Sequence, residues 1–129
     1  MLRSAKAAWL AGALVLTGMA AAPAMAEPDP ELVAAGENVF KKCKACHKVG
    51  EGAKNGTGPI LNGIIGHPAG AVAGFKYSSG LQDAAAGGLV WDQAAMTEFL
   101  TKPRDFIKAT KMSFVGLKDQ EDIDAVIAY

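Results

Sequence analysis

The sequence contains few residues that could cross-link the chain or bind a metal ion, with only two cysteines and two histidines among 129 residues. A structural zinc site needs four ligands. His67, the second histidine, lies in a stretch rich in glycine and proline, apart from the other three candidate ligands. A zinc site would have to use all the thiol and imidazole groups of the chain, namely Cys43, Cys46, His47 and His67. Zinc binding therefore stays open only as a less favoured alternative.

Alternating strand patterns are also missing, and so are internal repeats. A redox dithiol of the thioredoxin type should accompany a βαβ unit, and no such unit surrounds the cysteines. Helical periodicity and capping residues instead predict helices from residue 30 into the cysteines and over 79–86, 92–101 and 119–129. Loops at 50–80 and 104–118 join them, and the first loop is rich in glycine. We expect one all-α domain over residues 27–129.

The N-terminal segment, residues 1–26, predicts a secretory signal peptide. Arg3 and Lys6 form a positive start, an apolar run follows, and the small residues Ala24 and Ala26 mark a cleavage site. The run is short and alanine-rich compared with a membrane span of about 20 residues, so an uncleaved anchor is the less favoured alternative. We expect an exported, soluble protein of the periplasm.

Positive charge is not in excess. Removal of the two basic residues of the signal peptide lowers the basic count from 13 to 11, against 13 acidic residues, for a net charge of −2. Nucleic-acid binding depends on an excess of basic residues. The charge balance therefore disfavours a nucleic-acid partner.

The five residues 43–47 read Cys-Lys-Ala-Cys-His, the attachment pattern of a c-type haem. Two thiols at this spacing can add to the two vinyl groups of one porphyrin, and the imidazole that follows can bind the iron. Both cysteines are then consumed, so no structural disulfide is possible, and the haem itself becomes the cross-link. The sequence favours one covalent haem c, with zinc and dithiol chemistry as alternatives.

A second axial ligand to the iron would come from a methionine or from His67. Met96 falls on the apolar face of the predicted helix 92–101, which is typical of a core residue. Met112 lies in a polar loop with no helical pattern to explain it, and a thioether ligand raises the reduction potential of a haem. We therefore favour His47 and Met112 as the iron ligands, with His67 as an alternative to Met112. Two strong ligands favour simple electron transfer over oxygen or substrate chemistry.

From about residue 31 to residue 129 the chain resembles class I cytochrome c, especially the soluble bacterial members related to mitochondrial cytochrome c. The resemblance implies a small all-α fold of three to five helices and long loops wrapped around one covalently bound haem. The motifs that carry it follow one another in the order of the family: Gly36-x-x-x-Phe40-x-x-Cys43-x-x-Cys46-His47, Gly58-Pro59-x-Leu61-x-Gly63-x-x-Gly66, Gly74-Phe75-x-Tyr77-Ser78, Trp91, Leu100-x-x-Pro103, Thr110-Lys111-Met112-x-Phe114 and Ile127-Ala128-Tyr129.

The resemblance also implies roles for individual residues. Cys43 and Cys46 would form the thioether bonds to the haem, with His47 and Met112 on the iron. The carbonyl of Pro59 would accept the second ring N–H of His47. The haem propionates would take hydrogen bonds from Tyr77, Trp91 and Thr110, although Tyr77 and Trp91 could also be core aromatics. Gly36 and Phe40 would cross the C-terminal helix near Val126 and Tyr129.

The sequence departs from the family pattern in three places. Lys108-Ala109 replaces a Pro-Gly pair before the Met112 segment, so we expect a more mobile loop and a weaker iron–sulfur bond. His67 stands where many members have arginine near a propionate, so the potential could depend on pH. Phe99 stands where some members place a tyrosine beside the methionine, and it cannot donate a hydrogen bond to the sulfur.

Together these features predict a periplasmic one-electron carrier and not an enzyme. The resemblance implies a quinol–cytochrome c oxidoreductase as donor and a terminal oxidase or photosynthetic reaction centre as acceptor, with peripheral docking and a monomeric carrier. A peroxidase-like enzyme with a labile Met112 is the alternative. The lysines expected to border the haem and steer docking are Lys42, Lys44, Lys48, Lys54, Lys76, Lys108 and Lys111.

Overall fold

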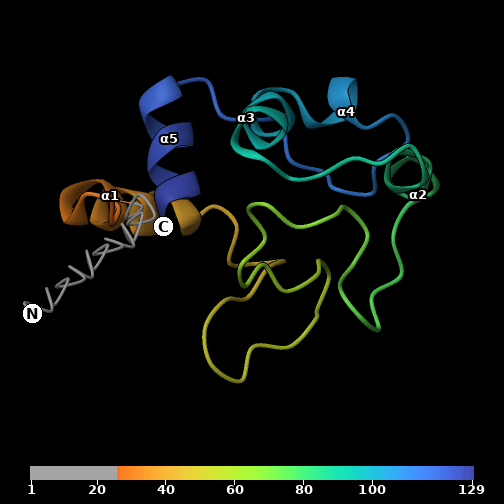
Figure 1. Ribbon diagram of the computed structural model, residues 1–129, viewed down its shortest axis with the longest axis horizontal. Coiled ribbons are helices and arrows are strands. Elements are labelled where there is room, and N and C mark those ends of the chain that lie inside the picture. The colour runs from red at the N-terminus through yellow and green to blue at the C-terminus, as the bar shows by residue number, and fades with distance from the viewer. Residues whose placement is uncertain (1–25) are drawn as a thin grey trace, which may run out of the picture.

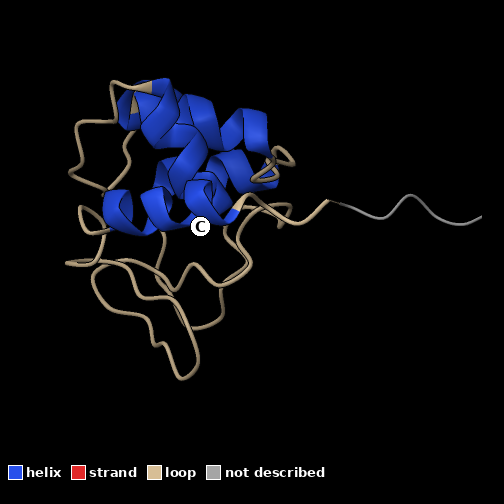
Figure 2. Ribbon diagram, turned by 90° about the vertical axis from the view of Figure 1, so that its left-hand side faces the viewer, coloured by secondary structure: helices blue, strands red, loops and turns tan. Residues whose placement is uncertain are grey.

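The computed structural model describes residues 26–129, in which the chain forms five helices and no strand. The predicted signal peptide, residues 1–26, lies outside this part except for its last residue. The helices gather at one end of the molecule and the loops at the other (Figure 2). The expected all-α architecture is confirmed. The helices are α1 (Pro30–Phe40), α2 (Ser79–Ala86), α3 (Gln93–Thr101), α4 (Pro103–Phe106) and α5 (Gln120–Ala128).

The first and last helices cross each other, which brings the two ends of the domain together (Figure 1). The side chain of Asp29 accepts a hydrogen bond from the N–H of Glu31 at the start of α1, and Pro30 occupies the first helical turn. A Cβ at Gly36 would collide with the backbone of Ala125, so glycine is needed for this close crossing. The rings of Phe40 and Tyr129 pack with their centres 5.4 Å apart.

The helix α2 begins at the predicted residue, and α3 begins one residue after its predicted start. The hydroxyl of Ser78 caps α2 by accepting from the N–H of Leu81, and the carboxylate of Asp92 caps α3 by accepting from the N–H of Ala95. The bounds of α2 equal the predicted range. Met96 on α3 packs against the core, as expected.

Two details of the prediction are wrong. Residues 104–118 are not loop throughout, because Pro103 does not simply end α3 but begins the single turn α4. Proline fits the first turn of a helix because its missing N–H has no partner there. Asp119 stands just before α5, yet its side chain makes no capping hydrogen bond.

The core consists of two clusters. One contains Val39, Leu117 and Ile123, and it joins α1 to α5. The other contains Ala69, Trp91, Phe99 and Ile107, and the ring centres of Trp91 and Phe99 lie 4.9 Å apart. Within residues 26–129, no helix has the length and apolar character needed to cross a membrane.

The long loop 41–78 is tied to the helical layer by a short antiparallel contact that the sequence did not reveal. Pro68 and Val90 form an isolated bridge, and the N–H of Trp91 donates to the carbonyl of His67. The contact holds the glycine-rich loop against the segment that leads into α3. His67 and Trp91 are thereby neighbours, while the side chain of His67 is exposed.

Candidate haem site

The imidazole of His47 is held in one orientation and one tautomer. Its Nδ1 lies 2.8 Å from the carbonyl oxygen of Pro59. A carbonyl can only accept a hydrogen bond, so Nδ1 carries the proton and Nε2 keeps its lone pair. This arrangement leaves Nε2 as the atom that can bind a metal, and the contact expected between His47 and Pro59 is present.

Gly58 leaves the space that the ring of His47 occupies. A Cβ at this position would lie 2.5 to 2.9 Å from three ring atoms of His47. The N–H of Gly58 also donates to the carbonyl of Cys46 at 2.8 Å, which ties the loop to the attachment segment. Residues 58–59 therefore position the imidazole in two ways: Gly58 leaves space for the ring, and the carbonyl of Pro59 binds its Nδ1.

The two cysteines share a turn that directly follows α1. Cys43 is half-buried and Cys46 is exposed, and both are free thiols. The N–H groups of Cys46 and His47 both donate to the carbonyl of Cys43. The side chains of Cys43, Cys46 and His47 therefore all extend from one tight turn. Burial raises the pKa of the Cys43 thiol, with an opposing effect from the positive charge of Lys42.

Met112 is held by its own loop and by the core. Its backbone N–H donates to Oγ1 of Thr110 at 3.2 Å, and its half-buried side chain packs against the cluster around Trp91. Ala109 adopts a left-handed backbone conformation with φ 55°. The loop thus forms a turn that suits glycine, although this chain places alanine there.

The three predicted propionate donors all keep a hydrogen available. The hydroxyl oxygen of Tyr77 accepts from the N–H of Val72, and that of Thr110 accepts from Met112, so each hydroxyl proton is free to donate. Trp91 is 5% exposed, its indole N–H has no acceptor among residues 26–129, and no side-chain polar atom in that range is both buried and unpaired. The indole N–H therefore reaches an accessible surface.

The apolar side chains of the loop fit the wall of a large apolar group. Ile60, Leu61, Ile64 and Phe75 remain half-buried, and they lie on the loop between His47 and α2. Ile64 and Leu81 pack on the same cluster as Met112. Two thiols, one fixed imidazole and one thioether are the donor set of a covalent haem, so the residues present fit a haem c.

The structure brings no zinc site together. No group of three or more histidine, cysteine, aspartate or glutamate side chains within residues 26–129 could hold a metal ion. The carbonyl of His67 accepts from the N–H of Trp91, beside the bridge between Pro68 and Val90. The alternative of a four-ligand zinc site is therefore wrong for this part of the chain.

Sequence reasoning missed two asparagines that pin the loop around His47. Asn55 accepts a hydrogen bond from the N–H of Ile60 and donates one to the carbonyl of Ala73. Asn62 accepts from the N–H of Gly50 and donates to its carbonyl. Each bond spans five or more residues, so no local pattern could have revealed it.

The chain belongs to the cytochrome c family: the sequence model described as Cytochrome c matches residues 33–129. A protein described as cytochrome c2 of Afifella marina is 50% identical over 99 residues, 77% of this chain and 80% of the relative. A cytochrome c2 of Rhodomicrobium vannielii is 41% identical over 128 residues, 99% of this chain and 94% of the relative. The solved structure of cytochrome c2 from Rhodospirillum centenum has a TM-score of 0.71 and 39% identity, covering 74% of this chain and 92% of that chain.

These comparisons establish the resemblance seen in the sequence. The family binds one covalent haem c, and the cytochrome c2 relatives are electron carriers and not enzymes. The chain is therefore a haem-containing electron carrier. The dithiol and peroxidase-like alternatives are not supported.

Proposed function

We propose that the chain is a periplasmic one-electron carrier in which His47 and Met112 would bind the haem iron and Cys43 and Cys46 would form the thioether bonds. The observation that carries the proposal is the 2.8 Å contact between Nδ1 of His47 and the carbonyl of Pro59, which leaves Nε2 free to act as a ligand. When bound, haem iron supplies the one-electron couple between its ferric and ferrous states.

The residues of this chain would hold the two iron ligands in place in both oxidation states. His47 is fixed by Pro59 and Gly58, and Met112 is fixed by Thr110 and the apolar cluster. Ligands that hold their places in both oxidation states lower the reorganisation that each electron transfer requires. Tyr77, Trp91 and Thr110 are proposed as propionate donors because each retains a free hydrogen.

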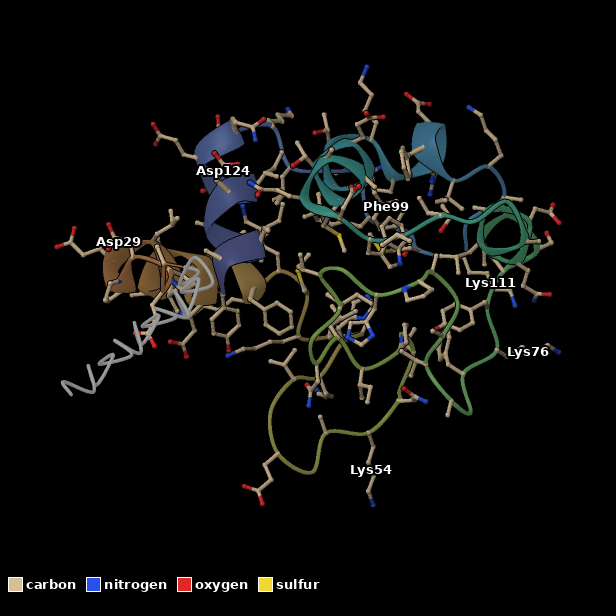
Figure 3. All side chains as sticks on the ribbon, in the orientation of Figure 1. Asp29, Lys54, Lys76, Phe99, Lys111 and Asp124 are labelled. Atoms are coloured by element: carbon tan, nitrogen blue, oxygen red, sulfur yellow. The ribbon has the colours of Figure 1, made fainter. Side chains whose placement is uncertain are left out.

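A separation of charge on the surface supports docking to membrane complexes. Lys54, Lys76 and Lys111 lie on the loops, away from Asp29, which precedes α1, and from Asp124 on α5 (Figure 3). Among residues 26–129 the one ion pair joins Lys42 to Asp122 at 3.5 Å, so the other lysines predicted to border the haem are not paired there. Such a face can steer the carrier toward acidic partners.

The proposed partners follow from the family. A quinol–cytochrome c oxidoreductase would reduce the carrier, and a terminal oxidase or photosynthetic reaction centre would oxidise it, with the carrier acting as a monomer. Export to the periplasm rests on the signal-like segment 1–26.

One experiment tests partners and location together. The full-length chain is expressed in a bacterium that attaches c-type haem, and the coloured protein is recovered from the periplasm and sequenced from its N-terminus. A start at Glu27, with rapid reduction by membranes that contain quinol–cytochrome c oxidoreductase, is the expected result. A protein retained in the membrane, or one that such membranes do not reduce, would contradict the proposal.

A further inference from the structure

One peptide group joins His47 to a side chain that is not part of the haem attachment. The carbonyl of Pro59 accepts from Nδ1 of His47 at 2.8 Å. The N–H of the same peptide group belongs to Ile60, and it donates to Oδ1 of Asn55 at 2.9 Å. The imidazole and the Asn55 side chain thus hold opposite ends of a single planar amide.

The far side of Asn55 is fixed as well. Its Nδ2 donates to the carbonyl of Ala73 at 3.0 Å, a residue 18 positions further along the chain. The side-chain amide therefore has one possible orientation, with its oxygen toward Ile60 and its nitrogen toward Ala73. A continuous hydrogen-bond chain runs from His47 through the Pro59–Ile60 peptide to Asn55 and Ala73.

Hydrogen bonds in a chain polarise one another. An acceptor on the N–H of an amide increases the negative charge on its carbonyl oxygen, because the two ends are conjugated. A more negative Pro59 oxygen draws the Nδ1 proton of His47 more strongly and makes the ring a better electron donor through Nε2. A better donor favours ferric over ferrous iron.

We propose that Asn55 is a positioning residue that tunes His47, and that it lowers the reduction potential of the haem through the Pro59–Ile60 peptide. This inference rests on the proposed role of His47 as the proximal ligand. Asn55 touches neither the imidazole nor the attachment turn in any of its hydrogen bonds, so its influence passes through the peptide group alone.

The same loop offers a matched control. Asn62 accepts a hydrogen bond from the N–H of Gly50 at 2.9 Å and donates one to its carbonyl at 2.8 Å. Asn55 and Asn62 thus make the same number and kind of bonds, and both residues are exposed. Only Asn55 is joined to the peptide that holds His47, so a general loss of loop stability should affect both variants alike.

The test compares Asn55→Leu with Asn62→Leu in the haem-loaded protein. The reduction potential is measured by spectroscopic titration, and stability is measured as the urea midpoint. The protein is also labelled with ¹⁵N-histidine for NMR, so that only the rings of the two histidines give signals. The chemical shift of the Nδ1 proton of His47 is measured in the ferrous state. Asn55→Leu should raise the reduction potential and shift the Nδ1 proton of His47 upfield. Asn62→Leu should lower the urea midpoint but leave the reduction potential and the proton shift unchanged.

A third variant separates the two ends of Asn55 and covers the case in which Asn55→Leu does not fold. Asn55→Asp keeps an acceptor for Ile60, loses the donor to Ala73 and adds a negative charge. The Nδ1 proton should then stay at, or move downfield of, its wild-type position. An upfield shift in Asn55→Asp would overturn the proposal, as would equal potentials and equal proton shifts in the two leucine variants.

Failure of the underlying assignment would look different. If His47 did not bind the iron, the ring protons of His47 in the wild-type ferrous protein would lack the strong upfield shift that a haem causes in its ligand. That result would remove the proposed ligation and the role of Asn55 together. A normal wild-type spectrum with unresponsive Asn55 variants would remove only the role of Asn55.

Discussion

The ring of His47 lies where Gly58 has no side chain, so this glycine decides how the imidazole can be placed. Its role does not depend on unusual dihedral angles, because its φ lies outside the left-handed region. The requirement is for space. The position two residues earlier, Gly56, has no such constraint, because a Cβ there would meet only the Cys46 carbonyl, at 3.8 Å.

We therefore expect Gly58→Ala to displace His47 and to lower the free energy of unfolding by about 1–3 kcal/mol. Gly56→Ala should change it by less than about 0.5 kcal/mol. Guanidinium unfolding of the two haem-loaded variants, followed by the haem absorbance, measures both. Equal midpoints would show that the imidazole does not need the space at Gly58.

Ala109 is a second residue whose backbone conformation should measurably lower the free energy of unfolding. A left-handed conformation costs an alanine about 1–2 kcal/mol relative to glycine, and part of this is offset because glycine is more flexible in the unfolded chain. Ala109→Gly should therefore stabilise the protein by roughly 0.5–1 kcal/mol. Ala34→Gly, at an exposed position in the middle of α1, should destabilise it by roughly 0.5–1 kcal/mol. Thermal unfolding of both variants gives the two signs, and a loss of stability in both would contradict the account of this turn.

Among the helices, the crossing of α1 and α5 depends most directly on one position. In an isolated helix, Gly36→Ala would gain about 1 kcal/mol from helix propensity. Here the added Cβ would meet the backbone of Ala125 and the Cβ of Tyr129, and a backbone cannot move aside cheaply. The packing term should therefore exceed the propensity term and reverse its sign.

We expect Gly36→Ala to destabilise the domain by about 1–3 kcal/mol. The neighbouring exposed variant Glu37→Ala should change stability by no more than about 0.5 kcal/mol. Urea unfolding at constant pH compares them. A stabilised Gly36→Ala variant would mean that the two helices do not cross at this residue.

The helices also show how far the sequence could predict the fold. Capping at Ser78 and Asp92 is local, so the starts of α2 and α3 could be read from the residues. The turn α4 was missed because a proline after a helix can end one helix or begin another, and the choice depends on packing. The Pro68–Val90 bridge was missed because two isolated residues carry no alternating pattern.

The candidate site likewise has some features that the sequence could predict and others that it could not. The attachment residues and Met112 could be chosen from spacing and from a methionine without a helical pattern. The bonds of Asn55 to Ile60 and Ala73 could not, because an asparagine in a glycine-rich loop has the same appearance whether its amide is pinned or free. The left-handed Ala109 could not be foreseen either, since its residue type argues against it.

In the molecule as a whole, charge is unevenly distributed. Acidic residues concentrate on or directly before α1 and α5, which hold eight of the 13: Glu27, Asp29, Glu31, Glu37, Asp119, Glu121, Asp122 and Asp124. Exposed lysines occupy the loops that follow α1 and α4 and the segment that leads into α2. A carrier with a net charge near zero can still be oriented by such a separation.

The rate of electron transfer to an acidic partner complex should therefore fall as salt rises from about 0.01 M to about 0.15 M, because the Debye length falls from about 30 Å to about 8 Å. Lys111→Glu should lower the low-salt rate and flatten its salt dependence. Lys102→Glu, on the linker between α3 and α4, serves as the control and should change the rate little. Stopped-flow oxidation or reduction by the membrane complex measures both effects, and a flat salt response in the wild type would exclude steering by these lysines.

We infer that His47 and Met112 bind the iron of a covalent haem, and this ligation has a direct optical signature. The haem-loaded protein is recorded in its oxidised form at the red edge of the spectrum, where a bond between methionine sulfur and ferric iron gives a weak charge-transfer band, and haem retention is checked after denaturation. We predict that the haem stays with the unfolded chain, that the band is present in wild type and Met96→Leu, and that it is lost in Met112→Leu. A band that persists in Met112→Leu, or a haem that leaves the denatured chain, would contradict it.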